Sequence, residues 1–199
     1  MRKLERDFFG RPTLEVARAM LGQALVHETP AGRLAGIVVE CEAYVGTEDL
    51  ASHARRGRTA RTSRMFGPPG IAYVYLIYGM YTMLNVVTEE EDFPAAVLVR
   101  ALEPLERITG GTNGPGRLCR ALGIDRGYDG LDLCGDVLYF ADVGRAIPDD
   151  QVRQTPRIGV DYAGEWAARP WRFLVAGNRW VSVPPPVATT LTGDGDGRA

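Results

Sequence analysis

The chain has 199 residues, of which 45% are hydrophobic and 24% are charged, and its formal net charge is −2 at pH 7. These values are typical of one globular domain with a sizeable core, and no apolar run approaches the ~20 residues that cross a bilayer. Because the net charge is negative, any surface that binds nucleic acid has to be a local one.

Cysteine, histidine and lysine are scarce, and this limits the possible chemistry. The three cysteines are widely spaced and there are two histidines, so we expect no metal site, no cofactor and a reducing compartment. Lys3 is the single lysine, which leaves almost no amine for a Schiff base. No apolar segment follows the basic N-terminus, so we expect no export signal and a cytoplasmic protein, nucleoid-associated if bacterial.

The first predicted elements are a helix and two strands. The helix begins at Thr13 as N-cap, ends at Gly22 and carries an apolar stripe of Leu14, Ala17, Met20 and Leu21. Strands follow at residues 24–28 and 36–46. Alternation in the second strand places Ile37, Val39, Cys41 and Ala43 on one face and Val38, Glu40, Glu42 and Tyr44 on the other. The two glutamates either form the solvated face of an edge strand or supply the chemistry of a site.

A long segment from residue 46 to 70 precedes a predicted hairpin with strands at 71–77 and 82–87. There is no acidic residue between Asp49 and Glu89, whereas the interval holds the arginines Arg55, Arg56, Arg58, Arg61 and Arg64 and the tyrosines Tyr73, Tyr75, Tyr78 and Tyr81. Arginine with interleaved aromatic residues is typical of surfaces that bind phosphates and stack bases. Tyr78 and Met80 at the hairpin tip either pack on a neighbouring loop or form a wedge that enters a base stack.

The remaining chain is predicted to contain strands and one short helix. A strand at residues 95–102 includes Arg100, which needs an acidic or phosphate partner if it is partly buried. The helix at 114–123 has a proline near its start and Arg117 in its first turn, where a phosphate could bind. Further strands are predicted around 136–142, 157–163, 171–177 and 180–183, and the tail after Pro184 to Pro186 is predicted to be disordered.

These features favour carboxylate chemistry. Nucleotide-binding loops and the zinc-protease and serine-hydrolase motifs are absent from the sequence. A carboxylate close to arginine and aromatic side chains suits the attack of water on an anomeric carbon, where charge develops on a sugar ring. The sequence therefore predicts hydrolysis of an N-glycosidic bond.

Six segments, in order, resemble the alkyladenine (3-methyladenine) DNA glycosylase family: VECEAY, DLASHARRGRTAR, MFGPPGIAYVYLIYGMYTMLNVV, AAVLVRALEPLE, GPGRLCRALGI and RIGVDYAGEWAARPWRF. The resemblance implies a single α+β glycosylase domain over residues 1–186, followed by a tail at 187–199. It also implies a curved, mainly antiparallel sheet with flanking helices and a protruding β-hairpin, as in the C-terminal domain of methionyl-tRNA formyltransferase.

The activity implied by this resemblance is base excision repair. Such an enzyme flips alkylated or deaminated purine nucleotides, such as 3-methyladenine or hypoxanthine, out of double-stranded DNA, because the bond is unreachable inside the base stack. It then hydrolyses the N-glycosidic bond with a glutamate-activated water. We expect a monofunctional monomer without metal or cofactor.

The resemblance also assigns roles to individual residues. It implies that Glu42 is the general base and that Arg100 positions the attacking water. The implied base pocket contains Tyr44, His53, Tyr75 and Asn85, of which Asn85 disfavours guanine; the implied intercalating residues are Tyr78, Met80 and Tyr81; and candidate phosphate contacts are Arg55, Arg58, Arg61 and Arg117. No role transfers to Glu40, which is expected to be structural or a weak electrostatic neighbour.

The chain departs from the family pattern in a short segment at 105–112, an extended acidic turn at Glu89–Asp92, and Arg117 where lysine is common. Two other classes stay open at this point. One is a non-catalytic nucleic-acid-binding module of the formyltransferase C-terminal type. The other is a nucleoside hydrolase for a small substrate, in which the hairpin and the arginine-rich segment would have no use.

Overall fold

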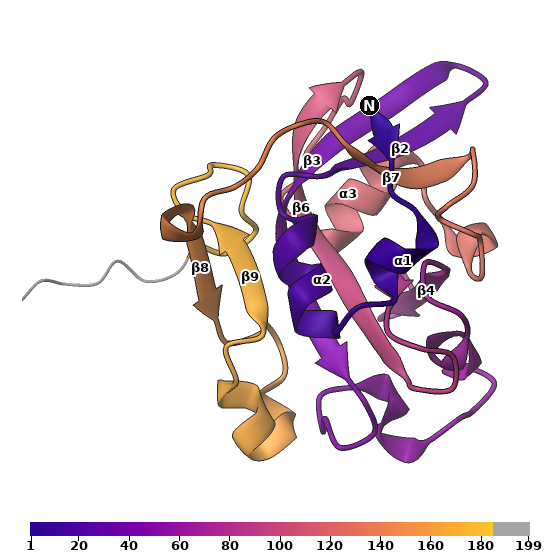
Figure 1. The fold of residues 1–199 in the computed structure, drawn as a ribbon, viewed down its shortest axis with the longest axis vertical. Coiled ribbons are helices and arrows are strands. Elements are labelled where there is room, and N and C mark those ends of the chain that lie inside the picture. Colours follow the sequence, from indigo (N-terminus) through magenta and orange to yellow (C-terminus); the bar gives the residue numbers. More distant parts are fainter. Residues whose placement is uncertain (185–199) are drawn as a thin grey trace, which may run out of the picture.

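The computed structural model describes residues 1–184 and shows one nine-stranded sheet whose paired strands are all antiparallel (Figure 1). Along the sheet the order is β1 (Arg2–Lys3), β7 (Leu138–Asp142), β2 (Ala24–Thr29), β3 (Gly32–Val45), β6 (Ala95–Glu106), β5 (Tyr81–Val87) and β4 (Ala72–Ile77). In addition β9 (Arg172–Val175) pairs with β3, and β8 (Val152–Thr155) pairs with β9. The predicted single-domain α+β class and mainly antiparallel sheet are confirmed, while the curvature and the formyltransferase likeness stay predictions.

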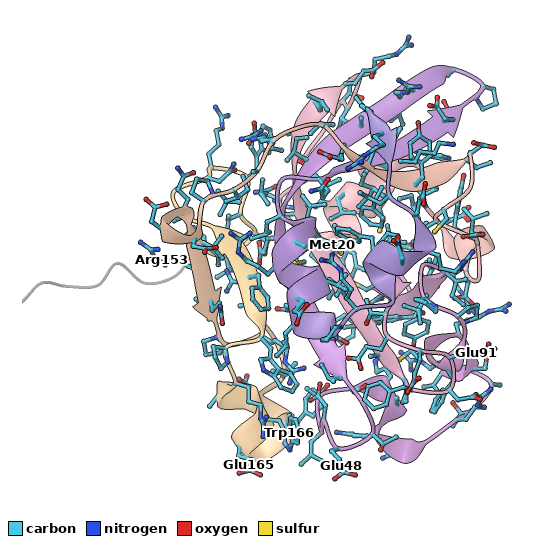
Figure 2. All side chains as sticks on the ribbon, viewed as in Figure 1. Met20, Glu48, Glu91, Arg153, Glu165 and Trp166 are labelled. Carbon is cyan, nitrogen blue, oxygen red and sulfur yellow. The ribbon has the colours of Figure 1, made fainter. Side chains whose placement is uncertain are left out.

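In the part of the chain that the structure describes, three α-helices and the main hydrophobic cluster lie on one side of the sheet. The helices are α1 (Arg6–Phe9), α2 (Thr13–Met20) and α3 (Pro115–Leu122), and short 3-10 turns occur at His53–Arg56, Ser63–Phe66, Arg126–Tyr128, Asp149–Gln151 and Asp161–Ala168. α2 packs across β3 and β6, and α3 across β5 and β6. Figure 2 shows Met20 on α2 over the middle of the fold, whereas Glu48, Glu91, Arg153 and Glu165 project from its periphery.

Strand alternation gives the sheet two chemically different faces. On β4, β5 and β6 the side chains of Val74, Leu84, Val86, Val97 and Val99 join the helices in the main hydrophobic cluster, and we call this side the core face. Their alternating neighbours Tyr73, Tyr75, Met83, Asn85, Leu98 and Arg100 point to the opposite side, which we call the pocket face. Residues two apart share a face in a strand, so the functional side chains of three strands converge on one side.

Two of the three register shifts where β3 meets β6 are bulges that change the predicted alternation. Val38 pairs with Leu102 and Glu40 with Ala101, so Val39 is an extra residue; Cys41 then pairs with Val99, so Arg100 is an extra residue on the other strand. The predicted alternation is therefore wrong for Ile37 and Val38, because Val38 joins Cys41 in the main cluster while Ile37 joins a separate cluster. Val39 lies in the main cluster with Cys41, as predicted. From Glu40 onward the prediction is correct. A bulge re-aims side chains, and here it directs Arg100 at the carboxylates of β3.

β3 is a central strand, so the edge-strand interpretation of its glutamates is wrong. It pairs with β6 on one side and with β2 and then β9 on the other. Both Glu40 and Glu42 have no exposed surface. Buried charges have to be paired and hydrogen-bonded, so these residues require partners from neighbouring elements.

Several other sequence predictions need correction. Residues 157–163 form no strand, because Gly159 adopts a positive φ of 73° and a 3-10 turn begins at Asp161. Residues 180–183 form no strand either, since the backbone N–H of Ser182 donates to Glu40 instead of to a neighbouring strand. β8 was not predicted. The tail at 187–199 and the boundary at residue 186 lie outside the described residues.

The start of α2 also differs from the prediction. The N-cap is Pro12, and Thr13 is the first helical residue. The backbone N–H and the hydroxyl of Thr13 both donate to Oε1 of Glu89, at 3.1 and 2.5 Å. Leu14, predicted to be in the apolar stripe, is 36% exposed, and Val16 is buried in the core instead. No helix within residues 1–184 is long and apolar enough to span a membrane.

A buried ion pair ties the segment after β3 to the segment before the last 3-10 turn. Arg157 contacts both carboxylate oxygens of Asp49, at 2.6 and 2.8 Å, and both side chains are fully buried. Arg157 also donates to the carbonyl of Ala43 at 2.9 Å. Such a bidentate pair fixes geometry as well as charge.

We predict that Asp49→Asn lowers the free energy of unfolding by about 3–5 kcal/mol, because it leaves the buried Arg157 charge without its partner. Urea unfolding at neutral pH measures this change. The double variant Asp49→Asn/Arg157→Gln removes both charges and should recover part of the loss. A change below about 1 kcal/mol in the single variant, the size of a surface pair, would contradict the prediction.

Candidate active site

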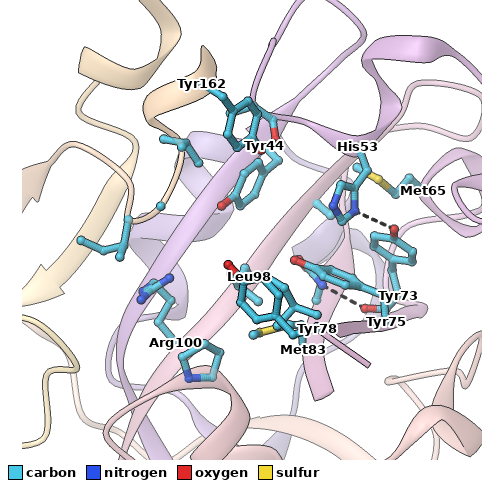
Figure 3. Close-up of a pocket in the computed structure, with 18 residues that line it drawn as sticks. Tyr44, His53, Met65, Tyr73, Tyr75, Tyr78, Met83, Leu98, Arg100 and Tyr162 are labelled. Carbon is cyan, nitrogen blue, oxygen red and sulfur yellow. Dashed lines mark hydrogen bonds between the residues drawn. The ribbon is translucent and has the colours of Figure 1, made fainter. Parts of the chain in front are cut away.

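A cavity of about 300 Å³ opens on the pocket face (Figure 3). Strands β3, β4, β5 and β6 form its base, and its rim comes from the 46–70 segment and from residues 158–162. Aromatic side chains dominate the lining: Tyr44, His53, Tyr73, Tyr75, Tyr78 and Tyr162. Its size is at the lower end of the range for small-molecule sites, which suits one flat heterocycle.

Glu42 lies below this cavity and is held by three donors. Its Oε1 accepts the backbone N–H of Ile158 at 2.7 Å, and its Oε2 accepts the hydroxyl of Tyr44 at 2.8 Å and Nη1 of Arg100 at 3.3 Å. All three donor residues line the cavity. A carboxylate offers about four acceptor positions, so among the contacts within residues 1–184 Oε1 keeps a position for one further donor.

The donors around Glu42 hold their protons. Burial, followed by the charge of Glu42, raises the pKa of Tyr44 well above its usual value. Burial opposes the charge of Arg100, but Glu42 and then Glu40 outweigh it and raise the pKa of this guanidinium. Tyr44 and Arg100 are therefore hydrogen-bond donors throughout the neutral pH range, and Glu42 is the acceptor between them.

An aromatic wall of His53, Tyr73 and Tyr75 lies across the cavity from Arg100, one of the donors to Glu42 (Figure 3). The rings of His53 and Tyr75 meet edge to face with centroids 4.6 Å apart, and Nδ1 of His53 lies 2.9 Å from the hydroxyl of Tyr73. Burial, then Arg61 and Arg55, lowers the pKa of His53 to about 4. The imidazole is thus neutral at pH 7 and can exchange hydrogen bonds with a neutral or cationic base.

Asn85 is fixed at the back of the cavity. Its side chain is nearly buried and its Nδ2 donates to the carbonyl of Tyr73 at 3.0 Å. This bond leaves the amide little freedom to rotate away from a bound molecule. The structure therefore brings all four predicted pocket residues, Tyr44, His53, Tyr75 and Asn85, to one cavity with Arg100.

The hairpin tip projects into solvent beside the cavity. Tyr78 is 84% exposed and Met80 67%, so the alternative that they pack on a neighbouring loop is wrong. Tyr78 also lines the cavity, and its positive φ of 53° together with that of Gly79 is the backbone conformation that a tight hairpin turn requires. Tyr81 is 42% exposed and packs against α3, where a Cβ on Gly116 would lie 3.2 Å from its ring.

The four candidate phosphate contacts separate into two groups. Arg55 and Arg61 line a second hollow of about 320 Å³, which shares His53 and Tyr162 with the first cavity. Arg58 instead pairs with Asp92 and covers the ring of Phe66. Arg117 donates to Asn113 and lines a separate hollow with Arg120 on α3. The structure thus brings only Arg55 and Arg61 to the aromatic cavity.

Sequence reasoning missed several lining residues. Tyr73, Met83 and Leu98 each lie two residues from a predicted site residue on the same strand, so strand alternation could have identified them. Residues 158–162 supply the N–H for Glu42 and one rim of the cavity, and no local pattern marks them. Within residues 1–184 no group of three or more His, Cys, Asp or Glu side chains could hold a metal ion.

Comparison with known proteins finds relatives that match most of this chain. The family model of methylpurine-DNA glycosylase matches residues 7–179. A protein of Anaeromyxobacter dehalogenans is 54% identical over 187 residues, which cover 94% of this chain and 88% of its own. A protein of Myxococcus xanthus is 52% identical over 188 residues, covering 94% and 96% respectively. Both bear names that mark them as candidate 3-methyladenine DNA glycosylases.

The lowered pKa of His53 predicts a pH-dependent contribution to stability. An unfolded histidine titrates near pH 6.5 and the folded one near 4, so between these values the unfolded chain binds more protons. Stability therefore falls as the pH is lowered through this window. His53→Gln should show a smaller drop in melting temperature between pH 7 and pH 5 than the unmodified chain, and an equal drop would contradict the prediction.

Proposed function

Because this chain belongs to the methylpurine-DNA glycosylase family, we propose that it excises damaged purines from double-stranded DNA by hydrolysing the N-glycosidic bond. In this proposal the damaged nucleotide leaves the base stack and its base enters the aromatic cavity. The enzyme acts as a monofunctional monomer, without metal or cofactor. Its substrates are alkylated or deaminated purines such as 3-methyladenine and hypoxanthine.

The observation that carries the proposal is the position of Glu42. The carboxylate is buried among donors that line a cavity of aromatic residues, and its Oε1 has one acceptor position left among the contacts within residues 1–184. A water at this position would donate one proton to Glu42 and direct its oxygen at the C1′ carbon of a nucleotide bound above it. Glu42 acts as the general base, and Arg100 holds the carboxylate and the water in line.

The aromatic wall supports a purine that carries positive charge or has lost electron density. Electron-rich rings attract a cation over their faces, and Tyr75 and Tyr44 line opposite sides of the cavity. Burial and then Tyr73 raise the pKa of Tyr75, so its ring stays neutral. A neutral His53 adds no opposing charge. In the proposal Asn85, which is fixed by Tyr73, disfavours the exocyclic amine of guanine.

The charged rim supports a DNA backbone next to the cavity. Arg55, Arg56 and Arg61 line the second hollow, and no carboxylate within residues 1–184 forms an ion pair with them. Arginine binds phosphate through several donors at once. We propose that the phosphates flanking the flipped nucleotide bind here, with Arg58 and Arg117 as more distant contacts. This local basic surface is compatible with a net charge of −2.

Two other functions receive less support. A non-catalytic binding module has no use for a buried carboxylate held by three donors. A nucleoside hydrolase for small substrates would have no use for a projecting hairpin with an 84% exposed tyrosine at its tip. Release of hypoxanthine from a defined duplex, compared with hydrolysis of free inosine, separates all three classes.

We predict that Glu42→Gln lowers the single-turnover rate of base release by at least about 100-fold, because the amide keeps the shape but cannot accept the proton. Binding to lesion-containing duplex should change by less than about threefold. The matched control is Glu48→Gln, which changes an exposed carboxylate in the adjacent segment. Release by Glu42→Gln within about tenfold of the unmodified enzyme would rule out Glu42 as the base.

We predict that Tyr78→Ala weakens the flipped complex by about five- to a hundredfold, because a base–aromatic stack is worth about 1–3 kcal/mol. Fluorescence of 2-aminopurine beside the lesion reports flipping. Tyr78→Ala should weaken the flipped complex less when the damaged base lies opposite a gap, because less stacking then has to be replaced.

The control for Tyr78→Ala is its thermal stability. Because the side chain is exposed, its removal should change the free energy of unfolding by no more than about 0.5 kcal/mol. Val137→Ala, at an exposed apolar residue beside β7, provides a matched surface change. A Tyr78→Ala protein that melts several degrees lower but flips the base normally would show that the tip is structural.

A further inference from the structure

A second carboxylate, Glu40, lies two residues before Glu42 on the same strand, β3, and has more polar partners. Its Oε1 accepts Nε of Arg100 at 3.0 Å and the hydroxyl of Ser182 at 2.8 Å, and its Oε2 accepts the backbone N–H of Ser182 at 2.5 Å. Nε of Arg172 lies 2.9 Å from the same Oε1, as an ion pair without hydrogen-bond alignment. Glu40 itself is fully buried.

The partners of the two glutamates give them different abilities. Glu40 is paired with two arginines and Ser182 on β6, β9 and the segment after β9. Neither glutamate lines the cavity itself, and of these partners of Glu40 only Arg100 does. Glu42 is bonded to three residues that do line it. Glu40 is therefore unsuited to activate a water, while its charge remains close to the residue that does.

Arg100 connects the two carboxylates. Its Nε bonds to Glu40 at 3.0 Å, whereas its Nη1 reaches Glu42 at the longer distance of 3.3 Å. Its Nη2 lies 3.4 Å from the hydroxyl of Ser182. The guanidinium is a rigid plane, so the bond to Glu40 fixes the direction in which Nη1 points at Glu42.

We propose that Glu40 is a positioning residue that divides the charge of Arg100 between two carboxylates, so that Glu42 is oriented by the arginine and still accepts a proton from water. This inference rests on the proposed role of Glu42 as the base. Without the charge of Glu40, Arg100 would neutralise Glu42 alone. A carboxylate paired one to one with an arginine is a poorer proton acceptor.

Other charged or titratable groups surround Glu42 and also affect how readily it accepts a proton. They are Tyr44 on the same strand, Arg100 on β6, Tyr75 on β4, Arg172 on β9, and Arg157 beside Ile158. The tyrosines keep their protons. The net charge that acts on Glu42 therefore depends mainly on the arginines and on Glu40, which is the other carboxylate in direct contact with Arg100.

The first test is Glu40→Gln. We expect the plateau rate of base release to fall by about tenfold, less than the 10²–10⁴ expected from losing a general base. We also expect the acidic limb of the pH–rate profile to move to lower pH by about one unit, because a negative neighbour of Glu42 has been removed. A merely structural role would lower the melting temperature without moving this limb.

The second test changes the other arginine and does not depend on Glu40→Gln folding. Arg172→Gln leaves Glu40 to pair with Arg100 alone and removes a positive charge, so the acidic limb should move to higher pH. The double variant Glu40→Gln/Arg172→Gln removes one charge of each sign. It should fold at least as stably as either single variant and return the limb toward its original position.

Glu42→Gln, measured beside these variants, separates the two proposals. The role of Glu40 is supported if the acidic limb moves to lower pH in Glu40→Gln and to higher pH in Arg172→Gln. It is also supported if the limb moves to higher pH in Arg172→Gln and returns in the double variant. A limb that stays in place in the folded variants, while Glu42→Gln is inactive, overturns it and leaves the proposed function intact. Retained release by Glu42→Gln overturns the proposed function itself.

Discussion

The burial of negative charge beneath the cavity is the constraint on which the site depends. Two glutamates on β3 have no exposed surface, and a buried carboxylate without partners would destabilise the fold by several kcal/mol. The donors come from β6, β9 and the segments that carry Ile158 and Ser182. Pairing these charges therefore also fixes the positions of the elements that enclose the cavity.

One face of the sheet packs the hydrophobic core, and the other face carries the residues of the candidate site. On the core face, β-branched and leucine side chains pack against α2 and α3. On the pocket face, the alternate residues of the same strands supply tyrosines, Asn85 and Arg100. One sheet sets the backbone positions of both sets, and hydrogen bonds between the site residues then fix their side chains.

Much of this arrangement could be predicted from the sequence, where local pattern and resemblance agreed. The hairpin, the strand with Arg100 and the helix at 114–123 follow from apolar periodicity and from Pro and Gly positions, and they are confirmed. The bulges at Val39 and Arg100 could not be predicted, because they depend on how two distant strands pair. For the same reason, nothing local showed that Ser182 and Arg172 would contact Glu40 or that Ile158 would contact Glu42. The catalytic roles of Glu42 and Arg100 stay predictions.

The Asp49–Arg157 pair has a consequence for how a ligand enters. It joins the segment leading to His53 to the segment that carries Ile158, so two neighbouring borders of the cavity are held together by a buried ion pair, and Ala51 also packs with Val160 and Ala163 there. Binding then requires little reorganisation of these borders, and less free energy is lost in ordering them. Discrimination between a damaged and an undamaged base would therefore depend on fit to a preformed shape rather than on closure around the ligand.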